Sequence, residues 1–174
     1  MSDLPEADRL DGWPHPREAR ALVGHGAAEA TLLRALNGNM PHAWIFGGLK
    51  GIGKATLAYR LAKAVMARGR GGAPLATLDT DLGADGRTIS LVNHPDSLGA
   101  APRPLATLDT DPNAPAVRRI VAGGHADLLT LRRPADPKTG KLKGELPVDE
   151  VRRLGDFFSR HSGEGGARIA IVDS

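Results

Sequence analysis

The sequence predicts an α/β domain in which a parallel sheet carries helices on both faces. Strand-like apolar runs alternate along the chain with amphipathic helical patterns, and this alternation is typical of parallel sheets. A glycine-rich stretch, GGLKGIGKAT at residues 47–56, joins one such run to a helix. Within it Gly48, Gly53 and Lys54 match G-x-x-x-x-G-K, the pattern of loops that hold phosphate groups. Together these observations predict the fold of a P-loop nucleoside triphosphatase.

Composition limits the other classes of function. The chain has 174 residues, of which 41% are hydrophobic and 25% charged, as expected of one globular domain. It has no cysteine and its six histidines are scattered, so we expect no disulfide and no zinc site. The formal charge of +3 permits contact with a polyanion but is too small to establish it. No apolar run approaches the roughly 20 residues of a membrane span, and the N-terminus does not resemble a signal peptide. We therefore expect a cytoplasmic protein without a membrane partner.

The N-terminal third is expected to contain a tail, a helix and a strand. Residues 1–16 carry three prolines and several charges and read as an extended tail. Residues 26–36 place apolar side chains at helical spacing, with Asn37 and Gly38 as a C-terminal stop. The apolar run at residues 43–46 is predicted to be the strand that leads into the glycine-rich loop.

A second helix is predicted directly after the loop. Leu57, Leu61 and Val65 form its apolar stripe, and Arg60 and Lys63 are expected to face away from the core.

An exact repeat marks the middle of the chain. PLATLDTD occurs at residues 74–81 and again at residues 104–111, within a region rich in glycine, proline and small residues. Two copies are too few for a solenoid, and surface loops tolerate insertions at modest entropic cost. We favour a local duplication over a repeated binding element, and expect residues 69–116 to form a flexible insert of low functional content.

Regular structure is predicted again in the last third. Residues 127–131 read as a strand, and Pro147 opens a helix whose stripe of Val148, Val151, Leu154 and Phe158 should be buried. The apolar run at residues 168–173 is predicted to be a buried strand that ends in a carboxylate.

The glycine-rich loop has the residues needed to cradle phosphates but lacks one needed for a metal. Gly48, Gly51 and Gly53 allow the backbone N–H groups to turn toward phosphate oxygens, and Lys54 supplies the cation. The next residue should carry the hydroxyl that binds Mg²⁺, and Ala55 has none. Thr56 lies one position later and is turned about 100° around the helix. The sequence leaves open whether ATP binds.

The carboxylate at the end of the last strand fits the same plan. In enzymes of this type a strand-end aspartate helps to hold the metal, and a glutamate that activates water often follows it. Asp173 stands at the first of these positions and Ser174 at the second. Both departures, Ala55 and Ser174, therefore affect metal binding and hydrolysis. We expect no metal site.

The motifs PHAW, GIGKATLAYR and LPVDEVR make the chain resemble the delta-prime subunit of the bacterial DNA polymerase III clamp loader, in its alphaproteobacterial form. The resemblance covers residues 16–68 and 117–174. It implies an AAA+ domain within a loader that places the ring-shaped sliding clamp on primed DNA. It also implies partners in the delta and tau/gamma subunits, and a subunit that usually does not hydrolyse ATP.

The resemblance also implies that this sequence contains only part of the family's fold. Family members carry further strands, a lid domain and a collar domain beyond the position of Ser174, and many carry a four-cysteine zinc module where this chain has its cysteine-free insert. We therefore expect residues 17–174 to be a partial, truncated AAA+ domain, interrupted by the flexible insert at 69–116 and without zinc.

Two other classes of function stay open at this point. The first is an active P-loop ATPase, either a motor-type loader subunit or another enzyme that acts on nucleoside triphosphates. The second is direct DNA binding through a basic loop, although no aromatic residues lie among its charges to stack on bases. The basic residues of this loop are Arg132, Arg133, Lys138, Lys141 and Lys143.

Overall fold

The computed structural model describes residues 8–9, 12–68, 104–136, 138–164 and 166–173. Its elements in chain order are α1 (Gly26–Asn37), α2 (Lys54–Ala67), α3 (Pro115–Val121), β1 (Leu128–Arg132), α4 (Val148–Ser159) and β2 (Ile169–Asp173). The three helices and two strands predicted at these positions are confirmed, apart from shifts of one or two residues at their ends. The short helix α3 was not predicted.

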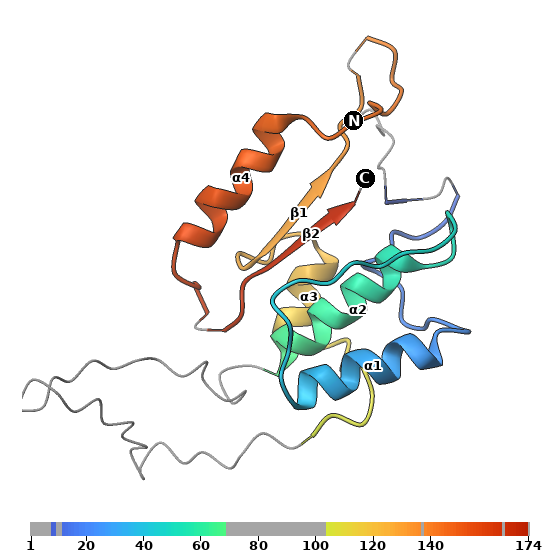
Figure 1. The fold of residues 1–174 in the computed structure, drawn as a ribbon, viewed down its shortest axis with the longest axis vertical. Helices are drawn as coiled ribbons and strands as arrows, with labels where there is room; N and C mark the ends of the chain where they lie inside the picture. The colour runs from blue at the N-terminus through green and yellow to red at the C-terminus, as the bar shows by residue number, and fades with distance from the viewer. Residues whose placement is uncertain (1–7, 10–11, 69–103, 137, 165, 174) are drawn as a thin grey trace, which may run out of the picture.

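The two strands form a parallel pair in which Leu128 lies opposite Ile169 and Arg132 opposite Asp173. Figure 1 shows α4 on one side of this pair and α2 with α3 on the other. Alternate residues of a strand point to opposite faces of a sheet. On the face toward α2 and α3, Ile171 packs with Tyr59, Ala62 and Ile120. The predicted arrangement of helices on both faces of a parallel sheet is confirmed for these two strands.

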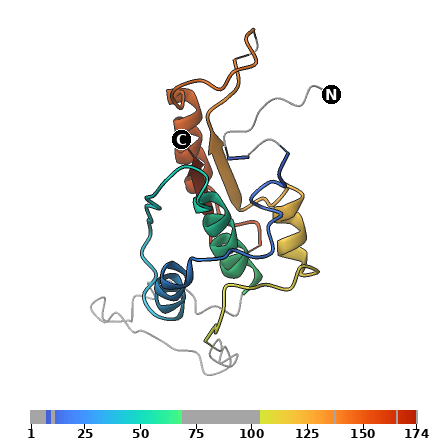
Figure 2. The same ribbon diagram turned by 90° about the vertical axis from the view of Figure 1, so that its right-hand side faces the viewer.

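A second part of the core lies between α1 and α2. Leu32, Leu57, Leu61 and Ala64 are buried there together with Leu108. Leu108 belongs to the second copy of PLATLDTD. Figure 2 shows α1 and α2 at the same end of the molecule, with the chain before α3 passing below them.

The segment at residues 104–116 therefore differs from our expectation of a flexible insert. Leu108 is only 1% exposed, and Asn37 exchanges two 2.8 Å hydrogen bonds with the backbone of Leu105. These apolar and polar contacts hold the segment against α1 and α2. The rest of the expected insert, residues 69–103, lies outside the described residues.

The expected N-terminal tail is also partly packed into the fold. Asp8 and His15 are buried, although both belong to the segment predicted to be extended and outside the domain. Polar partners in the domain, described below, account for this burial.

The apolar run at residues 43–46 does not form the predicted strand. Trp44 and Phe46 pack against the core around Leu32, whereas Ile45 between them is 96% exposed. A strand needs a neighbour to satisfy its backbone hydrogen bonds. Within the described ranges the sheet has two strands, and neither of them pairs with this run.

The burial predicted for α4 was wrong. Val148, Val151 and Phe158 are 67%, 43% and 54% exposed, and no residue of the helix is buried. The reason is the width of the sheet: α4 packs on β1, and a sheet of two strands covers only part of the helix. Leu154 and Phe157 are partly buried, and the Phe157 ring lies under the Arg168 guanidinium, 4.0 Å from ring centre to Cζ.

The polar face predicted for α2 was also wrong at two positions. Arg60 and Lys63 are each only 6% exposed. Arg60 donates to Glu29, to Asp109 and to the backbone carbonyl of Arg20. The residues before α1 and before α3 lie over this side of α2, and a sequence pattern within the helix carries no information about them.

Candidate functional site

The glycine-rich loop turns through three residues in the left-handed region. Gly48, Gly51 and Gly53 have φ of 147°, 81° and 103°. A side chain at such a φ costs free energy, so glycine is the residue that suits these positions. At Gly53 space is also limited, because a Cβ there would lie 2.7 Å from Cδ1 of Leu22. The three glycines predicted to shape a phosphate cradle therefore do shape the backbone of this turn.

The loop ends at the N-terminus of α2. Gly53 is the N-cap residue, and no side chain caps the helix there. The first N–H groups of a helix have no partner inside the helix, and together they carry a partial positive charge. An anion beside this turn would satisfy them.

Lys54 folds back over the loop that precedes it. Its Nζ donates hydrogen bonds to the carbonyl oxygens of Gly48, at 3.0 Å, and of Leu49, at 2.8 Å. The ammonium group thus lies at the loop itself. A bound phosphate would exchange these neutral acceptors for charged ones, which form stronger hydrogen bonds.

Asp173 stands at the carboxyl end of β2, as predicted. Burial raises the pKa of Asp173 above its usual value, and the negative charge of Asp8 raises it further, against the opposing charges of Arg133, Lys54 and Arg132. The loop lysine and the strand-end carboxylate therefore lie close enough to interact electrostatically. Among the ion pairs of the described ranges, none joins these two groups directly.

Two members of the predicted set follow Lys54 at the start of α2. Ala55 and Thr56 occupy the first turn of α2 and are both partly buried, and Ala55 has no side-chain oxygen. Within the part of the chain that the structure describes, no three histidine or acidic side chains gather as metal ligands would.

Sequence reasoning missed a polar cluster at the same end of the sheet. The carboxylate of Asp8, whose side chain is fully buried, accepts a 3.2 Å hydrogen bond from the Tyr59 hydroxyl and lies 3.2 Å from both His15 and Arg132. Burial raises the pKa of Asp8, but the hydrogen bond from His15 and the charge of Arg132 outweigh it, so the pKa is lowered overall. The one available signal was Tyr59, the single tyrosine of the chain, because a tyrosine on a buried helix face needs a partner for its hydroxyl.

Comparison with known families gives one match. Residues 27–174 match the family described as DNA polymerase III, delta subunit. The chain belongs to this delta-subunit family. The searches of curated proteins and of solved structures found no match.

Membership in the delta-subunit family identifies the general role of the chain. The family is part of the DNA polymerase III clamp-loader complex, which acts in DNA replication. The match runs through the glycine-rich loop, α2 and the strand that ends at Asp173, so all seven predicted site residues lie inside it. No helix of the described residues has the length and apolar character needed to cross a membrane.

Proposed function

We propose that the chain is a delta-prime-type subunit of the clamp loader that keeps the phosphate cradle of an ATPase without hydrolysing ATP. Its partners would be the delta and tau/gamma subunits, and it would meet the sliding clamp and primed DNA through the complex, in the cytoplasm. The observation that carries the proposal is Ala55. This residue stands where a Mg²⁺-binding hydroxyl is required, in a loop whose glycines and lysine are otherwise those of a phosphate site.

The described residues of the loop suit nucleotide phosphates but not the metal. Gly48, Gly51 and Gly53 give the backbone its turn, and Lys54 already lies over it. When bound, ATP would supply the phosphate charge that the start of α2 and Lys54 favour. Asp173 would be the remaining candidate for the metal, and burial raises its pKa above the usual value.

Turnover by the full-length protein tests this proposal. We expect no ATP hydrolysis above background, alone or with Mg²⁺, and the same result for Lys54→Ala. Hydrolysis by the natural protein that Lys54→Ala abolishes would overturn the proposal. Ala55→Thr is the informative companion because it restores the hydroxyl. Nucleotide affinity that depends on Mg²⁺ only in Ala55→Thr would support Ala55 as the reason for the lost chemistry.

The second candidate is an active P-loop ATPase. It is favoured by the intact glycines and lysine and by the position of Asp173 near Lys54. It requires Mg²⁺-dependent ATP binding by the natural protein. Calorimetry that detects no heat with Mg²⁺ and ATP would argue strongly against it.

A further inference from the structure

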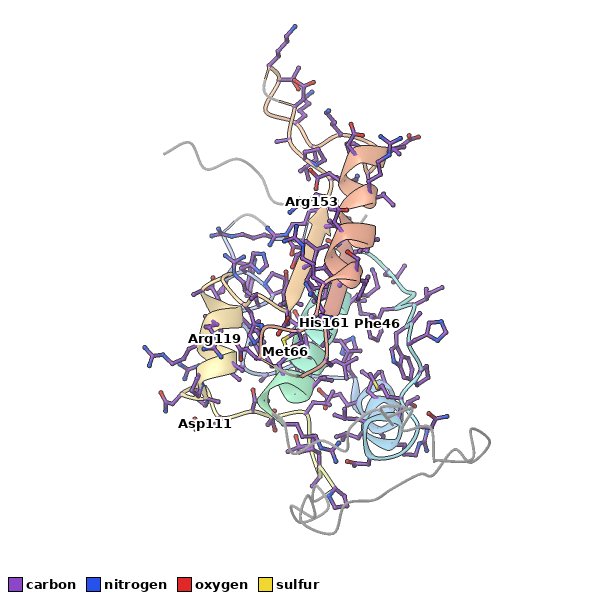
Figure 3. All side chains as sticks on the ribbon, turned by 90° about the vertical axis from the view of Figure 1, so that its left-hand side faces the viewer. Phe46, Met66, Asp111, Arg119, Arg153 and His161 are labelled. Carbon is purple, nitrogen blue, oxygen red and sulfur yellow. The ribbon has the colours of Figure 1, made fainter. Side chains whose placement is uncertain are left out.

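A second basic site lies on α2, away from the glycine-rich loop. Lys63 follows Lys54 by nine positions, which places it about 13 Å farther along the helix and half a turn around it. Figures 2 and 3 agree that α2 lies between the segment before the loop, which contains Phe46, and α3, which contains Arg119. The surroundings of Lys63 are therefore separate from the candidate phosphate loop.

Lys63 is buried and, among the described residues, forms no direct ion pair. Its side chain lines a cavity of ≈ 680 Å³ between the residues before α1, α2, the second copy of the repeat and α3. Its Nζ donates to the carbonyl oxygen of Ala19 at 3.3 Å, and no carboxylate of the described ranges lies within 4.0 Å of it. An ammonium group has three donors, so this single neutral acceptor leaves it poorly satisfied. Burial and then the charge of Arg60 lower the pKa of Lys63, and the negative charge of Glu18, which forms no direct ion pair with it, offsets only part of this lowering.

The other charged residues of the cavity lining are mostly cations. Arg20, Arg60 and Arg118 line it with Lys63, against the two carboxylates of Glu18 and Asp109. Asp109 is already ion-paired with Arg60 at 2.9 Å. Arg20 and Arg118 are exposed, and over the described ranges neither has a carboxylate within 4.0 Å. With Glu29, which also pairs with Arg60 from outside the lining, the four cations face three carboxylates, and over the described ranges Lys63, Arg20 and Arg118 have no direct ion pair.

The size and chemistry of the cavity indicate the class of ligand. Its volume falls within the range of sites for small organic molecules. A phosphate monoester carries about −1.5 to −2 charges at pH 7, which suits three cations without a direct ion pair, and its oxygens accept several hydrogen bonds. Guanidinium groups such as those of Arg20 and Arg118 bind phosphates in a bidentate manner. Leu108, Val117 and Val121 add an apolar wall for the organic part of such a molecule.

We propose that this cavity binds a phosphate monoester of a small organic molecule, with Lys63, Arg20 and Arg118 contacting the phosphate. The site is independent of the glycine-rich loop and of whether that loop binds ATP. The same chemistry could be presented by a free metabolite or by the phosphorylated 5′ end of a nucleic acid strand, and the probes below distinguish the two sources.

Calorimetric titration of the full-length protein tests the proposal. The probes are ribose 5-phosphate, adenosine monophosphate, adenosine without phosphate, and a short DNA strand with and without a 5′ phosphate. We expect saturable binding of the phosphorylated probes only. Tighter binding of ribose 5-phosphate than of the phosphorylated strand would identify a metabolite as the source, and the reverse order would identify a nucleic acid end.

Matched variants locate the site. Arg118→Gln and Lys63→Met should each weaken binding by about tenfold or more, since each removes a hydrogen bond to a charged group. Arg119→Gln removes the same charge from the adjacent position, outside the cavity lining, and should change affinity less than about twofold, because exposed charges interact weakly through water. Lys54→Ala instead reports binding at the separate glycine-rich loop, so a loss there without a loss in Arg118→Gln would place the ligand outside this cavity.

Three results would overturn the proposal: no saturable binding by the natural protein, equal losses in Arg118→Gln and Arg119→Gln, or a loss confined to Lys54→Ala. Arg118 is exposed, so Arg118→Gln is expected to remain folded even if Lys63→Met is not. Thermal unfolding of each variant, followed by circular dichroism, checks this.

Discussion

The guanidinium Nη2 of Arg60 lies 2.9 Å from the Oδ1 of Asp109, which joins α2 to a segment 49 residues later in the chain. The Arg60 side chain is 7% exposed and that of Asp109 is 65% exposed, so solvent screens the pair and its net contribution to stability is small. Its main effect is positional. It holds the second copy of PLATLDTD where Leu108 enters the core and where the basic cavity is formed.

Leu108→Ala is expected to lower the free energy of unfolding by about 2–4 kcal/mol. The side chain is 1% exposed among Leu32, Leu57 and Leu61, and its loss leaves a cavity. The measurement is urea denaturation. Leu49→Ala, at a leucine that is 80% exposed, is the matched control and should change stability by less than about 0.5 kcal/mol. Equal effects of the two substitutions would contradict the packing of this segment.

Gly53→Ala is expected to destabilise the protein more than Gly51→Ala. Both glycines have positive φ, which costs a side chain about 1–2 kcal/mol. A Cβ at Gly51 meets no atom within 4 Å, whereas one at Gly53 would lie 2.7 Å from Leu22. We therefore expect an additional loss of about 1 kcal/mol or more at Gly53. The same denaturation experiment checks this, and a smaller loss at Gly53 than at Gly51 would show that Leu22 does not pack on the loop.

We expect Asp127 to stabilise the folded protein at neutral pH and to lose this effect in acid. Burial raises the pKa of Asp127, but hydrogen bonds from the Ser162 hydroxyl and from the backbone N–H groups of Gly163 and Glu164 outweigh it, so the pKa falls below 3.8. A carboxyl group with a lowered folded-state pKa contributes stability above its unfolded-state pKa, and this contribution is lost as pH falls through the folded-state value.

Asp127→Asn should therefore cost about 1–3 kcal/mol at pH 7, because an amide cannot accept all three hydrogen bonds. The difference from the natural protein should shrink toward pH 3, and unfolding measured across this range would show it. The exposed Asp156→Asn is the control and should shift stability by less than about 0.5 kcal/mol at either pH. If the difference in unfolding free energy between the natural protein and Asp127→Asn stays constant with pH, the carboxylate of Asp127 is not the source of the stabilisation.

The apolar face of α4 is expected to tolerate truncation in the isolated chain. Phe158 is 54% exposed, so Phe158→Ala should reduce stability by less than about 1 kcal/mol. Leu131→Ala in β1 is the comparison, since Leu131 is fully buried and should cost about 2–5 kcal/mol. If Phe158→Ala reduces stability as much as Leu131→Ala does, this face of α4 is buried.

The sequence predicted the elements well because their signals are local. The glycines and Lys54 identified the loop, and helical spacing identified α1, α2 and α4 within a residue or two. Apart from the strand expected at residues 43–46, which does not form, and the short helix α3, which was not predicted, the errors concern burial. Arg60 and Lys63 are charged and were expected to face solvent, yet both are buried. Val148 and Phe158 are apolar and were expected to be buried, yet both are exposed.

The candidate site could be predicted only in part for the same reason. Gly53 and Lys54 lie next to each other in the chain, so a motif finds them. The interaction of Asp173 with Asp8 and Lys54 depends on how β2 and the N-terminal residues pack, which no motif records. The cavity around Lys63 combines residues from four separate segments, and its charge imbalance has no signature in any one of them.

The sequence by itself determined which residues stand in the glycine-rich loop, with an alanine where a metal-binding hydroxyl would be expected, and the positions of α1, α2, α4 and both strands. Tertiary structure decided which charges are buried, which apolar faces are covered and which distant segments meet. Backbone turns and helical periodicity arise from neighbouring residues, whereas burial depends on whatever else the chain brings to the same place.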